Sequence, residues 1–136
     1  MAASLYIVVE GEDPGFDIFV NGHALARNED ALELMARRLG AAPLLSFFSA
    51  DENSMALLLE QGTGNPSWAS HLPQPQWFDP SNGLRTVRTL IEFLFATPAA
   101  LGSETEAVMM ELREYERVLQ KTAERGLVWH LAVSWR

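Results

Sequence analysis

The sequence predicts an α+β fold: a small antiparallel sheet that includes the N- and C-terminal strands, with about four helices packed on one face. Two observations support this prediction. Apolar residues alternate with a period of two near both termini, whereas they repeat with a period near 3.6 in most segments between them. At 136 residues, of which 48% are hydrophobic, the chain fits one compact domain over residues 1–136 with a core of its own.

Both terminal segments have the pattern of strands. Over residues 4–10, three branched aliphatic residues fall on one face. Over residues 127–135, Trp129 and Trp135 fall on the same face as two aliphatic residues. A terminal strand with two tryptophans stays ordered only when it is paired and covered. We therefore expect the two segments to be antiparallel neighbours in one sheet, together with one or two further short strands.

The next part of the chain contains one clear helical pattern. Residues 16–20 alternate in polarity and predict a short extended piece that ends at the turn dipeptide Asn21-Gly22. From residue 28 to residue 39 the apolar positions form a stripe, two arginines occupy the last turn, and Gly40 follows. This pattern predicts a helix over residues 28–39.

Residues 44–48 have two open interpretations. This short apolar run after Pro43 fits a strand or a buried turn, and its length and aromatic residues favour the strand. Asp51 can cap a second helix, which Gly62 would end. Residues 61–78 then form an unusually long irregular connection for so small a domain.

Two longer helices are predicted in the second half. Asp79 is a capping residue followed by proline at the first helical position, the apolar stripe runs from Leu84 to Phe95, and Thr97-Pro98 ends the helix. Ser103 and Glu106 have the spacing of a capping box, which predicts the start of a fourth helix that Gly126 ends. That helix carries a basic stripe, and we expect its charges to pair with interleaved glutamates of the same helix; the stripe is Arg113, Arg117 and Lys121.

Composition and charge exclude several classes of function. The chain has no cysteine, which rules out disulfides, a thiolate nucleophile and cysteine-ligated metal sites. The net charge of −8 disfavours nucleic acid and anionic membranes as partners. No terminal segment has the plan of a signal peptide, and no apolar run approaches the roughly 20 residues of a membrane span. We therefore expect a cytoplasmic protein that binds neither nucleic acid nor membrane.

The histidines and acidic residues do not form a catalytic or metal-binding motif. His23 and His71 fall on predicted loops, where we expect them to be exposed, and we expect His130 to be half-buried in the last strand. No two histidines are four residues apart, so no helical metal pair exists. The carboxylates of residues 10–17 lack the spacing of a calcium loop and indicate a solvated acidic loop. The sequence therefore predicts no catalytic residue, no metal and no cofactor.

Two tryptophans of the long connection have two interpretations. Aromatic side chains on loops are enriched at contact surfaces, because they supply a large area at low entropic cost. Alternatively, both rings fold back and close the open side of the small sheet. We expect Trp77, which is tethered by Phe78 and the helix start, to pack beside the core like Trp129, and we expect Trp68 to be exposed.

Two functional hypotheses of different classes follow. The favoured one is a non-enzymatic protein-interaction module that binds a partner protein or itself, as a homodimer or as an acidic immunity or antitoxin protein. The alternative is a small-molecule-binding protein or hydrolase whose pocket is roofed by residues 61–78 and measures at least ~300 Å³. The candidate binding residues are Trp68, His71, Trp77, Asp79, Asn21 and His23.

Residue strings over nearly the full length carry a resemblance to known proteins. They are Ser4–Glu10, Gly15–Asp17, Phe19–Gly22, Ala24–Ala26, Phe47–Ser49, Trp77-Phe78, Gly83–Arg88 and Trp129–Val133. In these strings the chain resembles a set of short bacterial hypothetical proteins of unknown function. The resemblance implies a compact, stand-alone bacterial domain and assigns no catalytic residue. The last helix and strand are also similar to the end of the YfbM-like family, which has no assigned activity.

Overall fold

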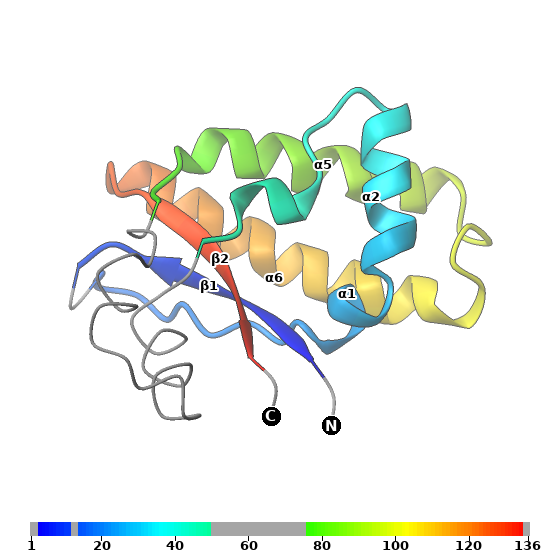
Figure 1. Cartoon of the computed structure of the whole chain (residues 1–136), viewed down its shortest axis with the longest axis horizontal. Coiled ribbons are helices and arrows are strands. Elements are labelled where there is room, and N and C mark those ends of the chain that lie inside the picture. The colour runs from blue at the N-terminus through cyan, green and yellow to red at the C-terminus, as the bar shows by residue number, and fades with distance from the viewer. Residues whose placement is uncertain (1–2, 12–13, 50–75, 135–136) are drawn as a thin grey trace, which may run out of the picture.

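The computed structural model describes residues 3–11, 14–49 and 76–134. Within them a two-stranded antiparallel sheet carries four α-helices on one face, which confirms the predicted α+β fold (Figure 1). In this part of the chain, no helix is long and apolar enough to cross a bilayer. In chain order the elements are β1 (Ser4–Val9), α1 (His23–Arg27), α2 (Glu29–Arg38), the 3-10 helix η1 (Leu44–Phe47), α5 (Pro80–Ala96), the 3-10 helix η2 (Gly102–Glu104), α6 (Thr105–Glu124) and β2 (Trp129–Ser134).

The two terminal strands pair with each other, as their alternation predicts. β1 runs antiparallel to β2 in a register that sets Val9 opposite Trp129. Every second residue of β1, from Leu5 to Val9, is buried. The further short strands that we expected are represented in the described residues by two isolated bridges, which Phe48 and Phe78 form with β2. β2 therefore has neighbours on both edges, which explains its deeper burial.

α5 begins as its sequence predicts and approaches β2 closely. The Asp79 carboxylate accepts a hydrogen bond from the N–H of Ser81 at 2.8 Å, and Pro80 occupies the first helical position. Gly83, one turn further, faces the indole ring of Trp129 and leaves no room for a β-carbon. The missing side chain thus lets α5 pack directly on Trp129, which is fully buried.

Residues 44–48 do not form the strand that their composition favours. They contain a turn of 3-10 helix, in which Leu44 and Phe47 fall on the same side and are both buried. The ring of Phe47 lies 5.5 Å from that of Phe78 and 5.2 Å from that of Trp129. Packing of these side chains into the core overrides the local preference for a strand.

The start of α6 also differs from the prediction. The capping box expected at Ser103 does not form, because Ser103 lies within η2 and no side chain caps the helix at Glu104. Instead, the hydroxyl of Thr105 accepts a hydrogen bond from the N–H of Leu101 at 3.2 Å. Gly126, with a φ of 66°, follows the helix as predicted. The helix predicted between Asp51 and Gly62 lies outside the described residues.

The segment that leads into α1 is held by Arg117 of α6 and by Arg125, which directly follows that helix. The guanidinium of Arg117 donates to the carbonyls of Asp17 and Phe19 at 3.2 and 3.4 Å, and Arg125 lies 5.4 Å from the ring of Phe16. The expectation that the basic stripe pairs within its own helix is therefore wrong for Arg117. The predicted extended piece over residues 16–20 forms no strand.

Candidate functional site

The predicted binding residues that the structure describes lie in two separate places. Asn21 and His23 stand at the start of α1, beside the first residues of β1. Trp77 and Asp79 flank Phe78, which forms its bridge with Trp129 of β2, the residue that pairs with Val9 at the far end of β1. About four residue steps of β1 separate the two places, or roughly 13 Å of extended chain. These four side chains do not converge on one pocket, and the remaining two candidates lie outside the described residues: Trp68 and His71.

Contrary to our expectation, His23 does not lie on an exposed loop, and its side chain takes part in the fold. It is the first residue of α1, a short helix that the sequence did not predict, and it is half-buried. Its Nδ1 lies 3.1 Å from the carbonyl oxygen of Ala3, and its backbone N–H donates to Asn21 Oδ1 at 3.1 Å. The His23 side chain therefore ties the start of α1 to the segment before β1, and the Asn21 side chain caps the His23 N–H.

Trp77 and Asp79 have different environments at the other place. The Trp77 ring is centred 4.9 Å from the ring of His130, which is 1% exposed and thus fully buried instead of half-buried. Trp77 itself keeps 38% of its surface exposed, so the expectation that it packs like Trp129 is wrong. The Asp79 carboxylate binds Ser81, and the hydrogen bonds from the Ser81 side chain and backbone lower the pKa of Asp79.

A buried carboxylate that the sequence analysis did not single out holds α1 in place. The two oxygens of Glu111 accept hydrogen bonds from the N–H groups of Ala24 and Leu25 at 3.0 and 2.9 Å. Such N–H groups at a helix start lack intrahelical partners, and negative charge is favoured beside them. Glu111 sits within the apolar stripe of α6, four residues before Tyr115. That position in the stripe is the signal that identifies it as buried.

Tyr115 ties the same region to β1. Its hydroxyl donates to the carbonyl of Leu5, and burial raises the pKa of Tyr115 well above its usual value, as do the charges of Glu111 and Glu114. Gly22 packs against both hydrogen-bonded groups and has no room for a side chain. Glu111 and Tyr115 form these hydrogen bonds with backbone atoms, so this cluster positions the chain.

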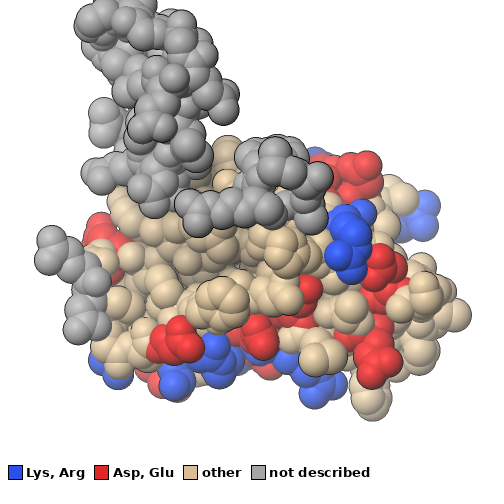
Figure 2. All heavy atoms as spheres, turned by 90° about the horizontal axis from the view of Figure 1, so that it is seen from below, with Lys and Arg blue, Asp and Glu red and all other residues tan. Residues whose placement is uncertain are grey.

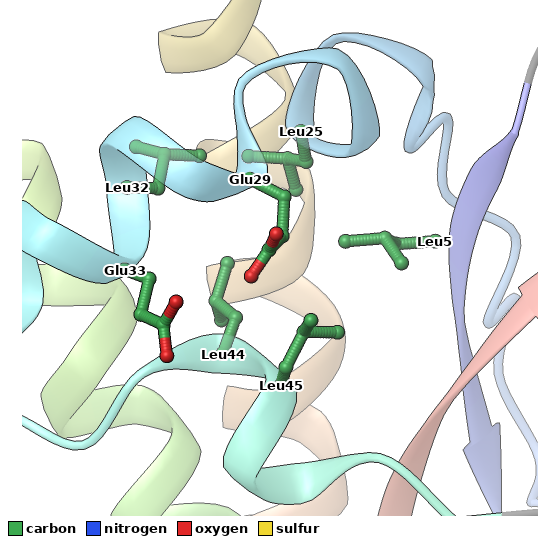
Figure 3. A pocket seen from close by; sticks show the side chains of 7 residues that line it. All are labelled: Leu5, Leu25, Glu29, Leu32, Glu33, Leu44 and Leu45. Atoms are coloured by element: carbon green, nitrogen blue, oxygen red, sulfur yellow. The ribbon is translucent and has the colours of Figure 1, made fainter.

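Two carboxylates border a small recess between α2, β1 and η1 (Figure 3). Glu29 and Glu33 lie four residues apart on α2, and leucines form the remaining walls. Burial raises the pKa of Glu29, as do its hydrogen bond with Asp30 and the charges of Asp30 and Glu33. Glu33 also pairs with Arg37 at 3.1 Å. The recess measures about 10 Å³, which is room for one water molecule.

A larger groove lies where the chain leaves α2 and where α5 begins. We call it the α2–α5 groove, and its volume is about 200 Å³. This is below the roughly 300–1,000 Å³ of pockets that hold drug-sized ligands. Of the predicted binding residues that the structure describes, none lines it. The residues that do are Gly40, Ala41, Ala42, Phe47, Asn82, Arg85 and Thr86.

Comparison with known proteins adds no functional assignment. No protein-family model, no curated protein and no solved structure matches the chain. Within residues 3–11, 14–49 and 76–134, no three His, Asp or Glu side chains are grouped so that they could hold a metal ion.

Proposed function

We propose that the protein is a non-enzymatic protein-interaction module whose contact surface includes Phe48 and Trp77. The exposure of these two rings is the observation that carries the proposal, since 44% of Phe48 and 38% of Trp77 is accessible to solvent. Aromatic residues, tryptophan above all, dominate the binding energy of protein interfaces. We call these two residues the aromatic pair.

Both members of the aromatic pair are anchored to β2. The N–H of Ser49, which follows Phe48, donates to a β2 carbonyl at 3.0 Å, and the Trp77 ring rests against His130. The N–H of Gln76 donates to Ser49 Oγ at 2.7 Å and so joins the two segments. Residues on segments whose backbone is already held in place lose less conformational freedom when a partner covers them. The aromatic pair is thus suited to binding.

The distribution of charge on one face is compatible with a contact surface. In Figure 2, uncharged side chains gather in the middle of this face, whereas most acidic and basic side chains lie along the lower border and the right side. The central parts of protein interfaces are depleted of charged residues. The net charge of −8 would in addition attract a basic partner, as an immunity or antitoxin role requires.

The polar groups at the predicted site favour binding over catalysis. Asp79 caps α5, and the Nδ1 of His23 contacts a backbone carbonyl. Glu111 caps α1 from within the core. A general acid or base must instead be within reach of a substrate proton. These groups are occupied by structural bonds.

Sedimentation velocity over a range of protein concentrations tests the proposal in its homodimeric form. We expect the wild type to dimerise and the variants Phe48→Ser and Trp77→Ser to shift it toward monomer. Phe95→Ser is the matched control, because the side chain of Phe95 is 74% exposed and stands at the end of α5 that is farther from Gly83, the residue that packs on Trp129 of β2. The control should leave the association unchanged.

Two results would count against the proposal in different ways. A wild type that stays monomeric at every concentration removes the homodimer and directs the test to a different protein. Co-expression with the products of neighbouring genes, using the same three variants, then replaces self-association as the readout. Equal loss of association in Phe95→Ser and Trp77→Ser would remove the aromatic pair as the contact surface.

A further inference from the structure

The α2–α5 groove presents two polar side chains beside apolar walls. Asn82 and Arg85 are three residues apart on α5, so they lie on the same side of the helix with their β-carbons roughly 5–6 Å apart. The walls opposite them come from Ala41, Ala42 and Phe47. An amide and a guanidinium therefore stand where one small polar group could contact both.

The shape of the groove is fixed before any ligand arrives. The hydroxyl of Thr86 donates to the carbonyl of Ala42 at 2.7 Å, which ties the segment after α2 to α5. Phe47 is buried, and its ring packs against Phe78 and Trp129. Walls that are held by the core do not have to be ordered by the ligand, which lowers the entropic cost of binding.

Arg85 has no ion-pair partner in the described part of the chain. Three other arginines each contact a carboxylate at 3.0–3.1 Å: Arg27, Arg37 and Arg88. Arg85 is exposed, and the side-chain amide of Asn82 likewise makes no hydrogen bond to a described residue. No described residue occupies the donors of these two side chains, which leaves them available to an anion.

We infer that the α2–α5 groove binds a small monocarboxylate with a short apolar body. The carboxylate would lie on Arg85 and Asn82, because a guanidinium matches the geometry of a carboxylate with two parallel hydrogen bonds. The apolar body would lie against Ala41, Ala42 and Phe47. The volume of about 200 Å³ limits the ligand to a few carbon atoms. This inference is independent of the proposed function, since neither member of the aromatic pair lines the groove.

The charge of the protein separates this ligand from phosphate. With a net charge of −8, the whole protein repels a dianion more strongly than a monoanion. Phosphate also has no apolar part to cover the walls of the groove. A monocarboxylate satisfies the charge of Arg85 and the apolar surface together.

Butyrate is the probe for a titration of the full-length, ¹⁵N-labelled protein followed by NMR. We expect saturable shifts in the side-chain resonances of Arg85 and Asn82, with a dissociation constant in the millimolar range. Arg85→Gln should weaken binding at least about tenfold, because it removes a charge-assisted hydrogen-bonded pair. Arg113→Gln is the matched control: Arg113 is exposed on α6, is not in an ion pair with a described residue and does not line the groove. It should bind butyrate like the wild type.

Four results would overturn the inference. They are the absence of saturation, equal weakening by Arg85→Gln and Arg113→Gln, phosphate binding as tight as butyrate binding, and butyramide binding as tight as butyrate binding. The second would show that only the net charge of the protein matters. The third would show that any oxyanion binds. The fourth would place the affinity on the apolar walls, because butyramide has the shape of butyrate without its charge.

Discussion

Replacing Glu111 by glutamine tests how much the buried carboxylate contributes to the fold. In the wild type, both carboxylate oxygens accept backbone hydrogen bonds from the start of α1. Glutamine keeps one oxygen, but its NH₂ group turns a donor toward the second N–H. One hydrogen bond then becomes neutral, and one N–H is left without a partner inside the protein.

The expected loss follows from these two changes. A hydrogen bond to a charged group contributes about 1.5–3 kcal/mol and a neutral one about 0.5–1.5 kcal/mol, while a buried unpaired N–H costs about 1–3 kcal/mol. Glutamine also avoids the cost of burying a charge, which offsets part of the loss. We therefore expect Glu111→Gln to lower the free energy of unfolding by about 2–3 kcal/mol, which lowers Tm by about 10 °C for a chain of this size.

Urea denaturation followed by circular dichroism measures this loss. Glu114→Gln is the matched control on the same helix, because Glu114 is exposed and accepts one hydrogen bond, from the N–H of Asn21 at 3.4 Å. The control should stay within about 0.5 kcal/mol of the wild type. If Glu111→Gln were as stable as Glu114→Gln, the carboxylate would not be what holds α1 against α6.

Three further substitutions have signed expectations. Gly83→Ala should lower the free energy of unfolding, measured in urea melts, by about 1–2 kcal/mol. The new β-carbon collides with Trp129, and this cost outweighs the gain in helix propensity. An unchanged or higher free energy of unfolding would contradict the close packing of α5 on Trp129. Glu29→Gln should raise Tm at neutral pH, because it removes a charge that the folded state disfavours. The gain in Tm should vanish as the pH falls through the raised pKa of Glu29, since protonation then removes the same charge from the wild type. A gain in Tm that persists in acid would contradict this electrostatic explanation. The wild type should lose stability as the pH rises above about 10, because Tyr115 then ionises in the unfolded chain but not in the folded protein. In parallel alkaline melts, Tyr115→Phe should lose less stability than the wild type over the same rise in pH.

The sequence predicts those elements that are stabilised by interactions between residues close together in the chain. The alternation at both ends predicts β1 and β2, and the need of an apolar terminal strand to be paired and covered predicts that they are neighbours, which the structure confirms. The Asp79-Pro80 dipeptide predicts the start of α5, because a cap and a proline act on the first turn alone. In each case the sequence contains both partners of the interaction, or the pattern repeats often enough to define a face.

The features that the sequence does not predict depend on contacts between distant residues. α1 is five residues long, and its first N–H groups bind Glu111, which lies 87 positions from Ala24. The turn at Leu44–Phe47 is set by packing against aromatic residues of later segments. The α2–α5 groove likewise depends on a contact between distant residues, since the hydroxyl of Thr86 on α5 donates to the carbonyl of Ala42 after α2. Such pairings are invisible to periodicity.

Urea melts of two variants test directly whether Trp77 belongs to a contact surface and not to the core of the domain. Trp129→Ala should lose about 3–5 kcal/mol, as truncation of a fully buried tryptophan does. Trp77→Ala should lose only about 1–2 kcal/mol, because 38% of the side chain is already exposed and a contact residue contributes mainly to association. Equal large losses for the two variants would contradict the account, because they would make Trp77 a core residue of its own domain.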